Sequence, residues 1–355
     1  MPPPHRSRAV SVRFALSIVL SIGALPLAAQ SQQSDNSRTL PIPPRLQWYA
    51  NFGYCGEVSF ISAGLYYGQY ISQYEARRIA SNNAPQAKEK SQLLLGVNDA
   101  RAARLMHLNA VQWDTSRTEN PRLFLAWVKR NIAAGYPAVI GVYMNQHLAE
   151  NNQDPDAGQA EYDHIVPVRG FTSSHPITTT SGYYEDDTLL LSDNGLWNPG
   201  RRPKYNYRYT LSDFLASRRD ANSPEGEIYS LAKSGGNYGI AITGIVDRDH
   251  QALPVRVATD VNDERPSMTQ GSSQRPPSQI IHLTVTVSGL RPGVAYRLYR
   301  YDQLASVPDA HFNAKAADAA QSWNIPGGSQ STYVLNQTID SDEVAVYRAV
   351  PATAP

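Results

Sequence analysis

The sequence predicts an α+β protein, with helices followed by an antiparallel sheet and then an all-β C-terminal domain. Three observations predict this fold. Apolar residues recur at helical spacing up to about residue 134, short apolar strand-like runs dominate from 138 to about 249, and strictly alternating strands follow a Pro- and Ser-rich stretch at 260–279. At 355 residues the chain is long enough for two domains, which we expect at 46–250 and 251–352, with a flexible loop at 260–279.

The periodicity places the individual elements. Helices are expected at about 55–66, 71–80, 96–108 and 121–134, the last with Pro121 near its start. Strands of the first domain are expected at 138–143, 165–171, 188–192, 205–209 and 238–243. In the tail, alternation predicts strands at 253–258, 281–287, 296–301, 331–335 and 343–348, which together resemble a small fibronectin type III-like β-sandwich.

The first 29 residues predict a signal peptide. Basic residues precede an apolar run from Phe14 to Leu25, and small residues ending at Ala29 fit a cleavage site. An uncleaved anchor is the alternative, although the run is short for a membrane-spanning helix. We expect a secreted or periplasmic protein with no membrane segment after cleavage, beginning with a disordered stretch over 30–45.

Composition excludes several function classes. The formal net charge of +1 provides no basic field for nucleic acid. The sequence holds no HExxH, CxxC, Walker or dinucleotide-binding motif, so no cofactor and no metal are expected. Charged residues at 247–250 and 260–264 are the nearest thing to a cation site, and solvated loops at a domain junction explain them better.

Cys55 is the only cysteine, and it lies where a glycine-flanked turn meets an amphipathic helix. An exported chain has little structural use for one thiol, because disulfides need an even count. The N–H groups of a first helical turn carry positive partial charge and stabilise a thiolate, the form that attacks carbonyl carbon. A small buried apolar residue is the alternative reading of the same cysteine.

Two further residues lie at the ends of predicted strands. His164 opens the strand at 165–171, where an imidazole can reach a helix N-terminus packed on the sheet and act as general base. Asp193 follows the strand at 188–192 and could orient that imidazole through its far nitrogen, with Asn194 as the fallback. A surface histidine and an ordinary Asp-Asn-Gly turn are the structural alternatives.

The order of these pieces resembles the papain-like cysteine peptidases, and most closely the bacteriocin-leader-processing (double-glycine) peptidase-like branch. The resemblance covers about residues 47–246. It rests on a cysteine at a helix start, a strand with Gly-x-Pro-Ala-Val-Ile-Gly, a strand opening with Asp-His-Ile-Val and a strand ending in Ser-Asp. It implies a papain-like fold and a thiolate–imidazolium pair of Cys55 and His164, oriented by Asp193, which forms a thioester that water resolves.

One departure concerns the oxyanion hole. The family places a glutamine six residues before the cysteine, and this position holds Tyr49. Asn51 and Gln47 are the amides available to replace it, and we expect Asn51, because its turn could bring the amide over the thiol. Glu57 is a second oddity: it suits the positive end of the helix but would oppose thiolate formation if it faced the sulfur.

The sequence therefore predicts a secreted thiol hydrolase that cleaves a peptide or isopeptide bond in a peptide or protein substrate, through Cys55, His164, Asp193 and Asn51. A transglutaminase-like acyltransferase would use the same thioester with an amine in place of water. The replaced glutamine favours a third reading, a non-catalytic binding or adhesion protein on the same scaffold.

Overall fold

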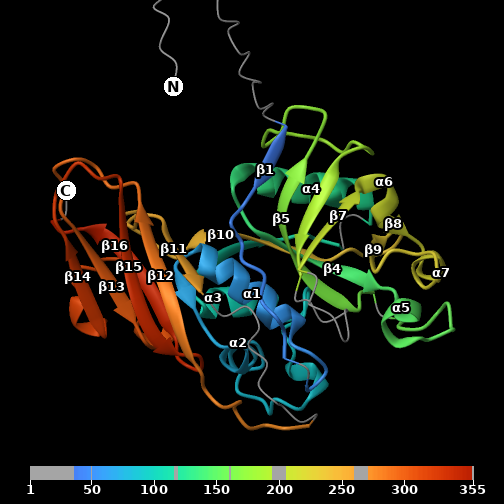
Figure 1. The fold of residues 1–355 in the computed structure, drawn as a ribbon, viewed down its shortest axis with the longest axis horizontal. Helices are drawn as coiled ribbons and strands as arrows, with labels where there is room; N and C mark the ends of the chain where they lie inside the picture. Colours follow the sequence, from blue (N-terminus) through green and yellow to red (C-terminus); the bar gives the residue numbers. More distant parts are fainter. Residues whose placement is uncertain are drawn as a thin grey trace, which may run out of the picture. The chain divides into compact units, whose positions relative to one another are not determined.

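The computed structural model describes residues 36–48, 50–115, 119–159, 161–193, 205–259 and 271–353, which form an α+β fold with mostly antiparallel sheets (Figure 1). The α-helices are α1 (Cys55–Tyr66), α2 (Gln73–Ala80), α3 (Asp99–Leu105), α4 (Pro121–Ala134), α5 (Gln146–Glu150), α6 (Leu211–Phe214) and α7 (Arg218–Ala221). The short 3-10 helices are η1 (Glu89–Ser91), η2 (Leu304–Ser306) and η3 (Ala316–Asp318).

The strands fall into three sheets. The largest contains β1 (Ser37–Thr39), β3 (Leu108–Gln112), β4 (Ala138–Met144), β5 (His164–Thr172), β6 (Thr188–Ser192), β7 (Asn206–Thr210), β8 (Leu215–Ala216), β9 (Tyr229–Ala232) and β10 (Gly239–Ile245). The second contains β11 (Val255–Thr259), β12 (Ile280–Ser288) and β15 (Thr332–Asp340). The third contains β2 (Gln69–Tyr70), β13 (Tyr296–Tyr301), β14 (Gln321–Ile325) and β16 (Ala345–Pro351).

The four expected helices are all present, and local chemistry sets their ends. The Ser72 side chain caps α2 by accepting from the backbone N–H of Glu75, and left-handed Gly135 (φ 90°) ends α4. The third helix is shorter than the predicted 96–108. It stops at Leu105 because His107 takes a left-handed φ of 53°, which an α-helix does not continue through.

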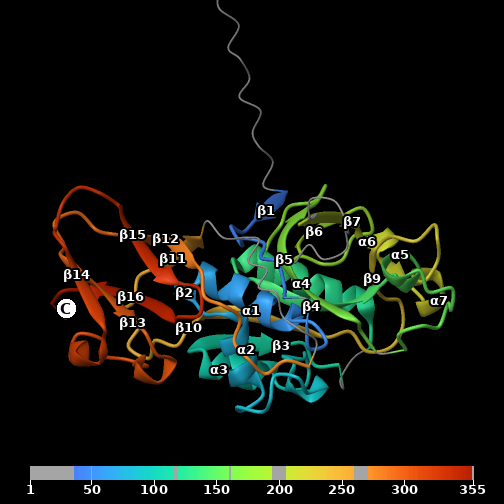
Figure 2. The same cartoon turned by 60° about the horizontal axis from the view of Figure 1, so that its bottom comes forward.

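The large sheet separates two cores. Its main path runs β3-β10-β4-β5-β6-β7, and β4 pairs with β5 so that Val142 lies opposite His164. Alternate residues of the central strands face opposite sides. Val139 and Ile165 pack in one core with side chains of α1, α2 and α3, whereas Ile140 and Val166 pack in the other with side chains of α4. Figure 2 shows α1, α2 and α3 grouped together beside the sheet.

Part of the expected disordered stretch at 30–45 is ordered. Strand β1 pairs with β5, with Ser37 opposite Thr172. Leu40 and Ile42 then bury their side chains in the α4 core, each at 2% exposure. The two apolar residues, separated by one proline, alternate like a strand, and the surface that they bury holds this segment in place. The polar residues around them led to the prediction of disorder.

The C-terminal sheets are continuous in packing with the first part of the chain. Strand β2, between α1 and α2, is the edge strand of the third sheet, and Tyr70 lies opposite Ala345 of β16. The Tyr70 hydroxyl donates to the Ser341 carbonyl oxygen at 2.7 Å. The described residues belong to one compact unit. The boundary expected between 250 and 251 is therefore a change of sheet rather than a gap between separately packed cores.

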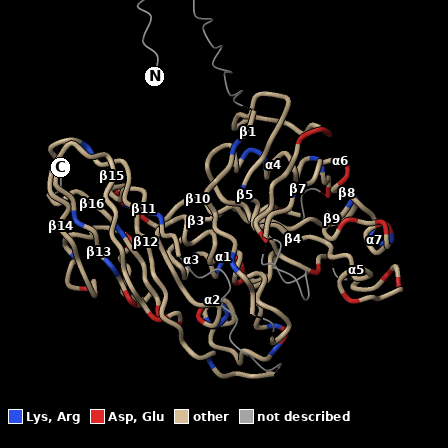
Figure 3. The backbone as a smooth tube through the Cα atoms, viewed as in Figure 1, with Lys and Arg blue, Asp and Glu red and all other residues tan. Residues whose placement is uncertain are grey.

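Lys and Arg residues and Asp and Glu residues are interspersed along the described backbone (Figure 3). Among the same residues, no helix combines the length and apolar character that crossing a bilayer requires. The predicted signal peptide at 1–29 lies outside the described residues.

Candidate active site

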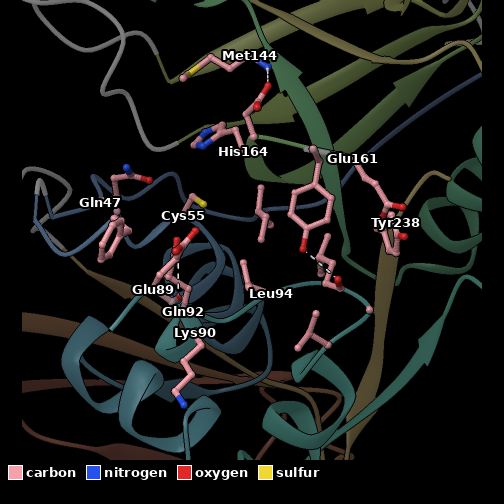
Figure 4. A pocket seen from close by; sticks show the side chains of 18 of the residues that line it. Gln47, Cys55, Glu89, Lys90, Gln92, Leu94, Met144, Glu161, His164 and Tyr238 are labelled. Carbon is pink, nitrogen blue, oxygen red and sulfur yellow. Dashed lines mark hydrogen bonds between the residues drawn. The ribbon is translucent and has the colours of Figure 1, made fainter. Parts of the chain in front are cut away.

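A cleft of about 1020 Å³ opens where the start of α1 meets the start of β5. Cys55, His164 and Gln47 line it together with two tyrosines, Tyr162 and Tyr238. Figure 4 shows the sulfur of Cys55 below the His164 ring, with the Gln47 side chain to one side. Residues from distant parts of the sequence therefore meet at one partly solvated point.

The first turn of α1 is fixed closely against β5. The Ser59 hydroxyl lies 2.7 Å from the Cys55 carbonyl oxygen and 3.1 Å from the Ile165 carbonyl oxygen, so it ties the helix to the strand. A Cβ at Gly56 would lie 2.0 Å from the Leu93 carbonyl oxygen, so only glycine permits this approach. No side chain caps the start of the helix. The N–H groups of its first turn are thus not satisfied by a capping side chain next to Cys55.

The turn before Cys55 is strained and held from behind. Asn51, Phe52 and Gly53 have consecutive positive φ values of 51°, 68° and 81°, a conformation unfavourable for a bulky residue such as Phe52. The buried Arg77 guanidinium donates to the carbonyl oxygen of Asn51 at 2.7 Å and to that of Gly53. The turn is over-determined by these bonds, which is the condition under which such strain persists.

Glu57 does not face the sulfur. Its Oε1 accepts from Arg77 Nε at 2.7 Å and from the Leu93 N–H at 3.0 Å, and both charged side chains are almost fully buried. The Arg77 guanidinium also lies over the Tyr54 ring, 3.6 Å from its centroid. The Glu57 carboxylate therefore holds Arg77 in place behind the turn, and the charge of Arg77 balances its own.

His164 is bonded on both sides of its ring. Its Nε2 lies 3.0 Å from Asp193 Oδ1, and a side-chain hydrogen bond joins it to Cys55. Since Nε2 is engaged by the carboxylate, Nδ1 is the nitrogen left for the sulfur. Burial opposes the charged ring, but the hydrogen bonds to Asp193 and Cys55 and the charges of both outweigh it and raise the pKa of His164 to about 10.

Asp193 is itself fixed by a residue that the sequence did not point to. The Tyr229 hydroxyl donates to Asp193 Oδ2 at 2.8 Å, while its ring stacks on the His164 ring at a centroid distance of 5.2 Å and an angle of 17°. The Asp193 N–H donates to the Tyr205 carbonyl oxygen at 2.7 Å. Tyr229 opens β9, a short strand without a distinct sequence pattern, so only the tertiary structure reveals it.

Asn51 is not placed as expected. Its side-chain nitrogen donates to the Ser272 carbonyl oxygen at 2.6 Å, and its side-chain oxygen accepts from the Gly271 N–H at 2.8 Å. It is fully buried and does not line the cleft. The left-handed turn directs this amide towards the 271–272 segment and away from the thiol, so the expected oxyanion role is wrong for this geometry.

Gln47, the other available amide, does line the cleft beside Cys55 (Figure 4). It is 5% exposed, and a Cβ on Gly53 would lie 3.2 Å from its Nε2, which places that amide against the turn before Cys55. Sequence distance favoured Asn51, but the reversal of the chain at 51–53 brings Gln47 to the site instead. Tyr49 and Asn194 lie outside the described residues.

Neither metal chemistry nor similarity to known proteins adds to this picture. Within the described ranges, no group of three or more His, Cys, Asp and Glu side chains is arranged to hold a metal ion, and the Asp247–His250 segment is no exception. No protein-family model matches the chain, and no curated protein or solved structure matches it either.

Proposed function

We propose that this protein is an exported thiol hydrolase of papain-like type, which cleaves a peptide or isopeptide bond. One observation carries the proposal: the only cysteine, a histidine and an aspartate from three separate elements meet in hydrogen-bonded order at a cleft. In nucleophilic catalysis the carboxylate bonds to the ring and the ring bonds to the sulfur. A chance contact has no reason to produce this spatial order.

In the first half of the reaction, the Cys55 thiolate attacks the carbonyl carbon of the scissile bond. A C–S bond forms, and the carbonyl π electrons move to oxygen. The tetrahedral intermediate then collapses, the C–N bond breaks, and the leaving amine takes the proton from His164 Nδ1. Asp193 holds the ring through Nε2 so that Nδ1 stays directed at the reacting atoms.

In the second half, water hydrolyses the thioester. Neutral His164 takes a proton from the attacking water, the new C–O bond forms, and collapse of the second intermediate breaks the C–S bond and restores the thiolate and the imidazolium. The Cys55 backbone N–H at the start of α1 and the Gln47 amide are the donors that would stabilise the oxyanion in both halves.

The arrangement of helices and sheet supports the same proposal. Helices α1 to α3 beside an antiparallel sheet, with the nucleophile at a helix start and the histidine at a strand start, are the arrangement that the papain-like resemblance implies. We assign the sheets β11-β12-β15 and β14-β13-β16-β2 to a fibronectin type III-like sandwich. Its inward residues, such as Val285 and Tyr299, share one core with α1.

Two other functions would use the same scaffold. A transglutaminase-like acyltransferase forms the same thioester and passes the acyl group to an amine. A binding or adhesion protein would not need a bonded Cys55–His164–Asp193 arrangement, nor an amide placed beside the nucleophile. The enzyme is therefore the better account of the site.

The test is to profile peptides cleaved by the mature protein from a mixed proteome-derived library, beside Cys55→Ala as the matched control. Cleavage by the wild type and none by Cys55→Ala is expected. Adding a primary amine at increasing concentration separates hydrolysis from transfer, because transfer converts the product from acid to amide. Binding of library peptides without product from the wild type would favour the binding protein.

A further inference from the structure

Asp193 has two carboxylate oxygens, and each has its own partner. Oδ1 lies 3.0 Å from His164 Nε2, and Oδ2 accepts from the Tyr229 hydroxyl at 2.8 Å. Asp193 is 1% exposed and Tyr229 is 0% exposed. Because both side chains are buried, the tyrosine hydroxyl is a donor that holds the carboxylate against rotation about its Cβ–Cγ bond.

The Tyr229 ring constrains the same group from a second direction. It stacks on the His164 ring at 5.2 Å, and the Tyr207 ring meets it edge-on at 5.1 Å. Strand β9, which carries Tyr229, is fixed to β4 by the pairing of Met144 with Tyr229. One side chain therefore contacts both the ring that moves the proton and the carboxylate that holds this ring.

We infer that Tyr229 is a positioning residue of the triad, which fixes the carboxylate plane of Asp193 so that His164 keeps Nδ1 directed at Cys55. The inference rests on the proposed function, since it concerns the same site. Tyr229 touches neither the reacting sulfur nor the cleft, whose lining does not include it. Its effect on turnover therefore passes through Asp193 and His164.

Among the described residues, the groups seen to face His164 come from three parts of the fold. Asp193 follows β6, Tyr229 is on β9, and Cys55 begins α1. Tyr207 on β7 lies one step further out, and its own pKa is raised by burial and by the Asp193 charge. Removal of the Tyr229 hydroxyl leaves Oδ2 of a buried carboxylate without this donor, so the carboxylate can rotate and release Nε2.

The test compares Tyr229→Phe with Tyr70→Phe. Each substitution removes the hydroxyl of a fully buried tyrosine that donates one hydrogen bond, but the Tyr70 hydroxyl donates to the Ser341 carbonyl oxygen at 2.7 Å and Tyr70 does not line the cleft. We expect Tyr229→Phe to lower kcat by ~10–100-fold, the range of a hydrogen bond to a charged group, with KM unchanged. Labelling of Cys55 by iodoacetamide at pH 6 should fall by a similar factor, and its rate should rise with pH as for an ordinary thiol.

A second measurement separates positioning from a general loss of packing. In an Asp193→Ala background the tyrosine hydroxyl has no carboxylate to orient, so adding Tyr229→Phe should change the labelling rate no further. An equal additional loss in that background would overturn the inference. Unchanged labelling and kcat in Tyr229→Phe alone would overturn it as well, as would an equal loss in Tyr70→Phe.

The labelling experiment also distinguishes the two proposals. If wild-type Cys55 reacts at the rate of a model thiol, the thiolate–imidazolium pair fails, and with it both proposals. If the wild type reacts fast and Tyr229→Phe does so equally, only the role of Tyr229 fails.

Discussion

A buried aspartate lies at each end of strand β6. Each forms an ion pair with a buried side chain, but the partner is a lysine at one end and a histidine at the other. Asp187 precedes the strand and accepts from Lys129 Nζ at 2.6 Å, with both side chains at 0% exposure. Asp193 follows the strand and binds His164 at 3.0 Å, with the ring at 2%. Only five residues separate the two carboxylates along the strand.

The difference lies in what the cation can do. Lys129 presents one nitrogen, packed near the Phe171 and Tyr184 rings. His164 has a second ring nitrogen, and this one faces a sulfur in a cleft. A buried ion pair therefore supports the fold at one end of β6 and, in the proposed enzyme, orients the catalytic imidazole at the other, and burial alone does not distinguish the two pairs.

The largest expected effect comes from removing each carboxylate in turn. Asp193→Ala should lower kcat/KM by ~10²–10⁴-fold, because the imidazole loses its orienting acceptor. Asp187→Ala should instead lower the free energy of unfolding by about 3–5 kcal/mol, since it leaves buried Lys129 unpaired. Urea unfolding and steady-state kinetics on the folded fraction check both. A large loss of turnover in folded Asp187→Ala would contradict the assignment of a structural role to Asp187 and a catalytic role to Asp193.

A smaller effect separates the two amides before the nucleophile. Gln47→Ala should reduce kcat by ~10²–10³-fold as an oxyanion donor is lost. Asn51→Ala should retain most of kcat and instead lose about 1–3 kcal/mol of stability, because its bonds to Gly271 and Ser272 hold the chain together. Kinetics and thermal unfolding of both variants check this division. The reverse ranking in kcat would restore Asn51 as the oxyanion donor.

The last expected effect is a dependence of stability on pH, with no change of turnover involved. Because the folded pKa of His164 is raised to about 10, above its unfolded value of about 6.5, the charged ring stabilises the fold fully below the unfolded value. This contribution is lost as pH rises through the folded pKa. The stability difference between wild type and His164→Gln should therefore shrink from pH 6 to pH 10, by an amount on the order of a few kcal/mol. Urea unfolding across that range measures it, and a constant difference would show that the ring is not held charged.

Much of this molecule could be predicted from local patterns. Helical spacing located α4 and alternation located β12, because in both elements the periodicity reports which face is buried. Apolar residues also located α1 and β13, but the expected one-sided burial is wrong for both: residues 56–66 of α1 are buried on every side, and residues 298–301 of β13 are buried in succession. The ends of strands also placed His164 and Asp193 on one edge of the sheet, and the structure brings them together. The α+β class follows from these elements.

The rest depends on contacts between distant residues. Three consecutive positive φ values at Asn51, Phe52 and Gly53 determine which amide, Gln47 or Asn51, lies beside Cys55. The residues Asn-Phe-Gly alone do not predict this conformation. Pairing of Arg77 with Glu57 and the stacking of Tyr229 on His164 join separate elements and leave no spacing signal. Disorder was predicted for residues that β1 and its buried neighbours hold in place, because two apolar side chains are a weak signal among polar ones.

The most direct test of the central claim is the rate at which iodoacetamide alkylates Cys55 at pH 6, relative to a model thiol and to His164→Gln. If His164 and Cys55 form an ion pair, the wild type reacts far faster than the model thiol, and the substitution removes the difference. A wild-type rate equal to that of the model thiol would contradict the account.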